Sequence, residues 1–182
     1  MKQFFLPLFA WFLPLALAAG ETVNVTALSS PGLKVMRTPT RMILGNIKIQ
    51  APEQFENALY VVAPRGPSGK PGMGYRFTID RPATVYIAVH RRGKPTIPAG
   101  WIRTPQILYW GHAGHGFMTP DTVYRKDFPA GVVDIPPHDG FDGRMYGIPH
   151  VAILPQGTPP NPLTEWTFEQ LQPVPKTEKI SP

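Results

Sequence analysis

The clearest alternation of apolar and polar positions along the chain runs through residues 75–92. Alternate residues of 75–79 are Tyr, Phe and Ile, and alternate residues of 85–89 are Val, Ile and Val, so each half has one apolar face. Between them Pro82 fixes its own φ and cannot sit in a central ladder, which favours a chain reversal over residues 80–83. The pattern predicts a β-hairpin that packs one face against a core.

Short apolar runs continue along the rest of the chain, separated by clusters of Gly and Pro. No stretch sustains the 3.6-residue period of an amphipathic helix, and many short strands between turn clusters are typical of an antiparallel sandwich. We therefore expect an all-β fold, an antiparallel β-sandwich of the jelly-roll or immunoglobulin-like kind. The runs are 33–36, 42–49, 58–63, 107–110, 122–124, 132–135 and 149–154, of which 58–63 is expected to be buried on both faces.

The two ends of the chain differ from its middle. Residues 1–19 combine Lys2, a long apolar run and small residues before Gly20, which is typical of a secretory signal peptide. A membrane anchor is the alternative, but the run contains prolines and falls short of the roughly 20 apolar residues that a spanning helix needs. We expect one β-sandwich domain over residues 20–155, no transmembrane segment in the mature chain, and a Pro-rich tail over residues 156–182.

Composition narrows the compartment and the partners. The chain has no Cys, so an exported domain must be held by burial and hydrogen bonds, which favours a bacterial periplasmic or extracellular protein over a disulfide-stapled one. Its 18 Lys and Arg exceed its 12 Asp and Glu, but the basic residues are spread along the sequence and form no basic run. This argues against nucleic acid as a partner and stays compatible with anionic polysaccharide or lipid headgroups.

Two loops carry the residues that would suit a metal ion. His112 and His115 stand three apart in one loop, and His138 and Asp139 stand in another, so the four would form a zinc site if the loops converge. The spacing matches no zinc signature, and solvent-exposed histidines are the competing interpretation. The Asp- and Gly-rich run 139–143 would suit calcium, although it supplies few oxygen ligands.

Hydrolytic chemistry has no clear sequence signal. The serines of the chain beyond the signal peptide lie in expected loops or ends, and none stands in a G-x-S-x-G elbow. The acids near strand ends suit turns and ion pairs. A metal-dependent hydrolase built on the loop histidines remains the enzymatic alternative.

Sugar binding asks for aromatic faces together with a few planar polar or cationic groups. The aromatic candidates are Trp110, Tyr109 and Tyr146, with Trp101 and Tyr124 as further possibilities that core packing would also explain. The cationic candidates are Arg91, Arg92 and Arg144. His90 is expected to cap its strand.

Three segments resemble, in order, a β-sandwich module of secreted bacterial proteins that is often attached to polysaccharide-degrading enzymes. They are FTIDRPATVYIAVHRR from Phe77, PAGW from Pro98 and KDFPAGV from Lys126, and with the opening GLKV the likeness covers about residues 32–135. The resemblance implies an ancillary, noncatalytic domain associated with carbohydrate. The sequence departs from that pattern at His90, where an aspartate is usual.

These observations predict an exported noncatalytic module that binds a polysaccharide or other glycan, without a cofactor. Two alternatives stay open. One is the metal-dependent hydrolase, and the other is a protein-interaction module of the bacterial envelope whose Pro-rich tail docks a partner.

Overall fold

The computed structural model describes residues 22–37, 41–44, 47–112 and 119–156. Within these ranges the chain is all β, with a single 3-10 turn at Glu53–Phe55 and no α-helix. The expected signal peptide, the tail and part of the loop after His112 lie outside the described residues. Among the described residues, no helix is long and apolar enough to cross a membrane.

Eleven strands are described, and neighbouring strands pair antiparallel. They are β1 (Val25–Leu28), β2 (Lys34–Arg37), β3 (Arg41–Leu44), β4 (Ile47–Gln50), β5 (Leu59–Val62), β6 (Tyr75–Ile79), β7 (Ala83–His90), β8 (Ile102–His112), β9 (Thr119–Phe128), β10 (Gly131–Ile135) and β11 (Val151–Leu154).

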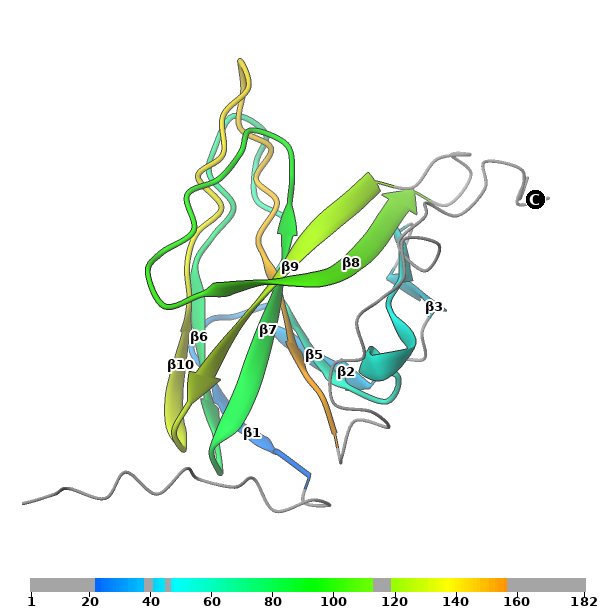
Figure 1. The fold of residues 1–182 in the computed structure, drawn as a ribbon. Coiled ribbons are helices and arrows are strands. Elements are labelled where there is room, and N and C mark those ends of the chain that lie inside the picture. The colour runs from blue at the N-terminus through cyan, green and yellow to red at the C-terminus, as the bar shows by residue number, and fades with distance from the viewer. Residues whose placement is uncertain (1–21, 38–40, 45–46, 113–118, 157–182) are drawn as a thin grey trace, which may run out of the picture.

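The strands form two sheets, which confirms the expected β-sandwich. One sheet has the order β1-β6-β10, and the other has the order β2-β5-β11-β7-β9-β8-β4-β3. β6 and β10 lie side by side in one layer, while β8 and β9 curl away from that layer (Figure 1).

The predicted hairpin over residues 75–92 is wrong in its pairing. β6 pairs with β1 and β10, whereas β7 pairs with β11 and β9, so the reversal at Pro82 carries the chain from one sheet to the other. Alternation shows which face of a strand is apolar, but it does not decide whether two strands hydrogen-bond edge to edge or stack face to face. Stacking buries the apolar faces of β6 and β7 against each other in one core.

The core has two parts, one on each face of the larger sheet. The part between the sheets joins β6, β7 and β10 and includes Phe77, Ile79, Ile87 and Val133. The other part lies on the opposite face and includes Phe55, Tyr60, Leu108 and Ile153. Because β5, β7 and β11 contribute to both parts, these strands are apolar on both faces, as expected for residues 58–63.

The hydroxyl of Tyr75 ties the two sheets together. It accepts a hydrogen bond from the backbone N–H of Ala152 at 3.0 Å, and the carbonyls of Val61 and His150 each lie 2.9 Å away to accept its proton. Burial raises the pKa of Tyr75, so the hydroxyl stays neutral and keeps this donor. A polar group of the smaller sheet thereby satisfies backbone groups of β5, β11 and the loop before β11.

Candidate functional site

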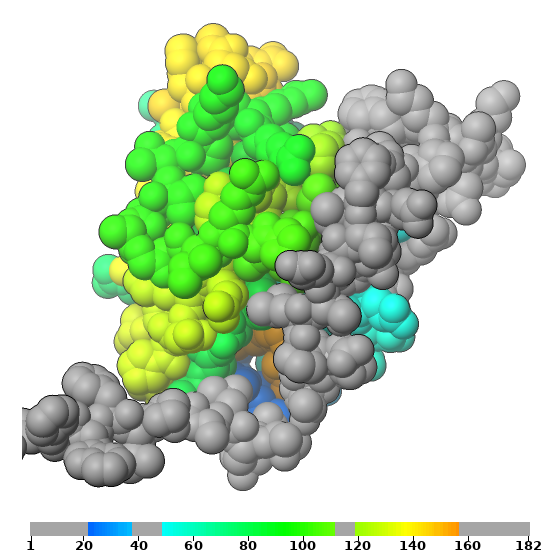
Figure 2. Space-filling view, viewed as in Figure 1, coloured from blue at the N-terminus to red at the C-terminus, as the bar shows by residue number. Residues whose placement is uncertain are grey.

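A cleft of about 530 Å³ lies where β7, β8 and β9 meet the loop of residues 91–101. Three basic side chains line it, from Arg91, Lys94 and Arg103, and its lining contains no carboxylate. The other lining residues are Val89, Pro95, Ile97, Thr122 and Tyr124. In the space-filling view the green segments from this region lie on the front of the molecule, below the yellow loop of residues 136–149 (Figure 2).

Strand register places these residues on one face of the larger sheet. Val89 pairs with Thr122, and Arg103 pairs with Tyr124, so the lining residues of three neighbouring strands share the face that also carries the inter-sheet core. Between Arg103 and Ile107 the pairing of β8 with β9 shifts. Pro105 lies in this interval and has no N–H for the ladder, which accounts for the bulge and for the bend of β8.

The basic groups of the cleft are held to different degrees. The Arg91 Nε donates to the hydroxyl of Thr122 at 3.0 Å, which directs this guanidinium along β9. Lys94 follows the turn at Gly93 and has a positive φ of 50°. Both Lys94 and Arg103 are exposed. These three positive charges repel one another across the cleft. An anion bound there would be attracted by all three and would relieve that repulsion.

Backbone hydrogen bonds fix the rim of the cleft to the loop of residues 136–149. The N–H of Phe141 donates to the carbonyl of Gly93 at 2.9 Å, and the N–H of Thr96 donates to Asp139 Oδ1 at 2.8 Å. The second bond lowers the pKa of Asp139. Phe141 is 61% exposed, whereas the other aromatic side chains in the described part of the chain are buried or half-buried. The backbone of this exposed aromatic residue is therefore bonded to the residue before Lys94, which lines the cleft.

A cluster of rings lies around His90, at the end of β7. Its imidazole is 2% exposed, and ring centroids lie at 4.8 Å for Trp110, 6.1 Å for His138 and 6.4 Å for Tyr146. Burial, followed by the positive field of His138, Arg92 and Arg65, lowers the pKa of His90 to about 4. The imidazole is therefore neutral at pH 7. Its Nδ1 accepts a hydrogen bond from the backbone N–H of Arg92 at 3.3 Å, just beyond the end of β7, so His90 caps its strand as the sequence suggested and also packs in the ring cluster.

Asp121 is the most unusual acid in the described residues. It is 5% exposed, its Oδ1 accepts a hydrogen bond from the indole Nε1 of Trp110 at 2.8 Å, and burial raises the pKa of Asp121 to about 8. The His90 Nδ1 lies 3.7 Å from the same oxygen. Because the acid has the higher pKa, this contact joins a neutral carboxyl to a neutral imidazole at pH 7, and it is not an ion pair.

The six residues predicted to bind a ligand are divided among four places. Arg91 lines the basic cleft. Tyr146 is contacted by the guanidinium groups of Arg92 at 5.1 Å and Arg144 at 5.0 Å, so these three form a stack of their own. Trp110 lies on the opposite face of the sheet beside Asp121, and Tyr109 is buried.

The residues proposed for metal binding are only partly within the described chain. His115 and the side chain of His112 lie outside it. His138 accepts a bond from the Gly140 N–H through Nδ1 at 3.3 Å and donates from Nε2 to the His90 carbonyl at 2.8 Å, so backbone groups occupy both nitrogens. Across residues 22–37, 41–44, 47–112 and 119–156, no three His, Cys, Asp or Glu side chains are placed to hold a metal ion.

Sequence reasoning missed Lys94, Arg103, Phe141 and Asp121. The sequence could have indicated Asp121. It stands two residues before the apolar Val123 on β9, so both side chains point to the same buried face, and a buried acid usually has a shifted pKa or a specific partner. Arg103 and Phe141 had no such signal, since their neighbours come from distant segments. Comparisons with family models, with curated proteins and with solved structures found no match for this chain.

Proposed function

We propose that this protein is an exported, noncatalytic carbohydrate-binding module, and that its basic cleft binds an acidic polysaccharide. The observation that carries the proposal is the lining of the cleft, with Arg91, Lys94 and Arg103 as its charged groups and no carboxylate among them. Carboxylate or sulfate groups of a glycan would pair with these cations. The long loops at this end of the sandwich leave the cleft open to a polymer.

The aromatic groups of the region fit the same ligand. Phe141 offers an exposed ring on a residue whose N–H is bonded to the Gly93 carbonyl, and Tyr124 lines the cleft with a half-buried ring. Aromatic rings stack on the C–H faces of sugars, while guanidinium and ammonium groups select their charge. Neither the cleft nor its rim presents a nucleophile with an adjacent base, so the proposal assigns binding and no catalysis.

The test is binding of the purified full chain to polygalacturonate, with uncharged dextran as the comparison polymer. We expect affinity electrophoresis to show retardation by polygalacturonate alone, and retardation to weaken as salt increases. Arg103→Gln should weaken binding several-fold. The matched control is Arg125→Gln, which removes the same charge from β9 next to Tyr124 but on the other face of the sheet.

Two results would overturn the proposal. One is equal retardation by dextran and polygalacturonate. The other is equal loss of binding in Arg103→Gln and Arg125→Gln, because the effect would then follow net charge and not the cleft.

A further inference from the structure

A second pocket, of about 120 Å³, lies on the face of the larger sheet opposite the basic cleft. Its walls are mainly apolar and come from Ile49, Leu108, Ile148, Pro149 and Val151, with Trp110 on one side. The volume is comparable with the roughly 150 Å³ of an engineered apolar cavity that binds benzene. The pocket therefore has room for one small ring.

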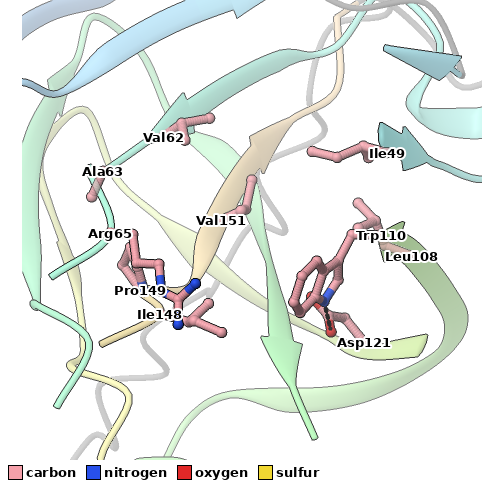
Figure 3. Close-up of a pocket in the computed structure, with 10 residues that line it drawn as sticks. All are labelled: Ile49, Val62, Ala63, Arg65, Leu108, Trp110, Asp121, Ile148, Pro149 and Val151. Carbon is pink, nitrogen blue, oxygen red and sulfur yellow. Dashed lines mark hydrogen bonds between the residues drawn. The ribbon is translucent and has the colours of Figure 1, made fainter. Parts of the chain in front are cut away.

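Two groups with different chemistry stand on opposite sides of this pocket. Trp110 and Asp121 lie together on one side, joined by their hydrogen bond, while Arg65, Ile148 and Pro149 lie on the other (Figure 3). The Arg65 side chain is held by a bond from its Nε to the Tyr146 carbonyl at 3.2 Å. No carboxylate in the described part of the chain pairs with Arg65, so its remaining guanidinium N–H groups are available to a ligand.

The charges around the pocket favour an anion. At pH 7 the buried Asp121 is protonated, which leaves Arg65 as the one charged group of the lining. A neutral carboxyl can donate one hydrogen bond and accept others, so it suits a hydroxyl group and does not repel an anion.

We propose that this pocket binds a small hydroxylated aromatic carboxylate. Its carboxylate pairs with Arg65, its ring lies between the apolar walls and the indole of Trp110, and its hydroxyl bonds to Asp121. A guanidinium can bind both oxygens of a carboxylate, which selects a carboxylate at the Arg65 end of the pocket. The size of the pocket limits the ligand to about one ring. The site is separate from the basic cleft, because the sheet lies between them.

The test uses 4-hydroxybenzoate as the probe, titrated into the full chain by calorimetry. We expect saturable binding with one site, with a Kd from micromolar to about 1 mM. Benzoate, which lacks the hydroxyl, and 4-hydroxybenzyl alcohol, which lacks the carboxylate, should each bind about tenfold more weakly. Arg65→Gln should weaken 4-hydroxybenzoate about tenfold and leave 4-hydroxybenzyl alcohol unchanged.

The matched control is Arg103→Gln, which removes the same charge from the other face and should leave the titration unchanged. Asp121→Val should abolish the preference for 4-hydroxybenzoate over benzoate, and circular dichroism shows whether this variant is folded. If Asp121→Val is unfolded, the comparison of 4-hydroxybenzoate with benzoate in the unmodified protein tests the Asp121 end of the site by itself. Absence of saturation at about 10 mM probe, or equal weakening in Arg65→Gln and Arg103→Gln, would overturn the proposal.

Discussion

Asp121 and Thr122 are consecutive residues of β9, yet they line two different pockets on opposite faces of the larger sheet. Successive side chains of a strand point to opposite faces, so one strand supplies a neutral acid to the small pocket and a hydroxyl to the basic cleft. The pockets can therefore be altered independently by single substitutions.

The buried carboxyl of Asp121 should make the protein less stable in alkaline solution. The pKa of this acid is about 8 in the folded protein against an ordinary 3.8, so between these values the folded state holds a proton that the unfolded state has lost. Its contribution to stability is complete below about pH 4 and is lost as pH rises toward 8, at about 1.4 kcal/mol per pH unit.

Asp121→Asn should remove this loss. Thermal melts of both proteins from pH 5 to pH 9 should show that the melting temperature of Asp121→Asn increases relative to that of the parent as pH rises. Asp134→Asn removes an exposed carboxylate of the smaller sheet and should show no such gain. A constant difference between Asp121→Asn and the parent across this range would contradict the prediction.

Buried histidines should limit stability on the acid side. Burial is the main cause that lowers the pKa of His90 to about 4 and that of His150 to about 3, from 6.5, so the unfolded chain binds protons that the folded one excludes. Stability should fall as pH drops from about 6.5 toward 4. Asp121 acts in the opposite direction, because its contribution is lost as pH rises toward 8.

His150→Phe keeps a ring beside His138 and removes one of these protonation sites. The free energy of unfolding in urea, measured at pH 7 and pH 5, should fall less between the two for His150→Phe than for the parent. The same fall in both proteins would show that His150 does not carry the acid sensitivity.

The Tyr75 hydroxyl should be worth more to stability than an average hydrogen bond. In Tyr75→Phe the buried N–H of Ala152 and the carbonyls of Val61 and His150 lose their shared partner while the ring stays in place. We expect a loss of about 1–3 kcal/mol in urea unfolding. Tyr86→Phe, on a half-buried ring of the larger sheet, is the control and should cost less.

The sequence allowed the fold class to be predicted, but not which strands pair. The alternation in β6 and β7 correctly marks Phe77 and Ile87 as buried, because burial on one face is a local property of a strand. Whether the two strands pair or stack depends on β1, β10, β9 and β11, which compete for the same edges. The sequence pattern contains no information about that competition.

The candidate site was predictable only in part, for a related reason. Arg91 follows a clear strand and was a candidate from its position alone. The cleft also needs Arg103, which Pro105 and the bulge in β8 bring opposite Tyr124. The small pocket needs Arg65 and Asp121 from segments far apart in the chain. Such convergence is a property of tertiary structure.

The contact between Gly93 and the loop of residues 136–149 should support binding at the basic cleft. Gly93 has a φ of +76°, and a Cβ there would lie 2.2 Å from the carbonyl carbon of Gly140. Gly93→Ala should therefore separate the two loops, break the bond from the Phe141 N–H to the Gly93 carbonyl, and displace Lys94. We expect several-fold weaker binding to polygalacturonate by affinity electrophoresis.

Gly69→Ala separates this effect from backbone strain. Gly69 has a similar φ of +87°, but a Cβ there would meet nothing within 4 Å, so this variant carries only the cost of a left-handed conformation, about 1–2 kcal/mol. Both variants should lose some thermal stability, and only Gly93→Ala should lose binding. Equal binding by the two would mean that the joined loops do not shape the cleft, because strain of the same kind is present in each.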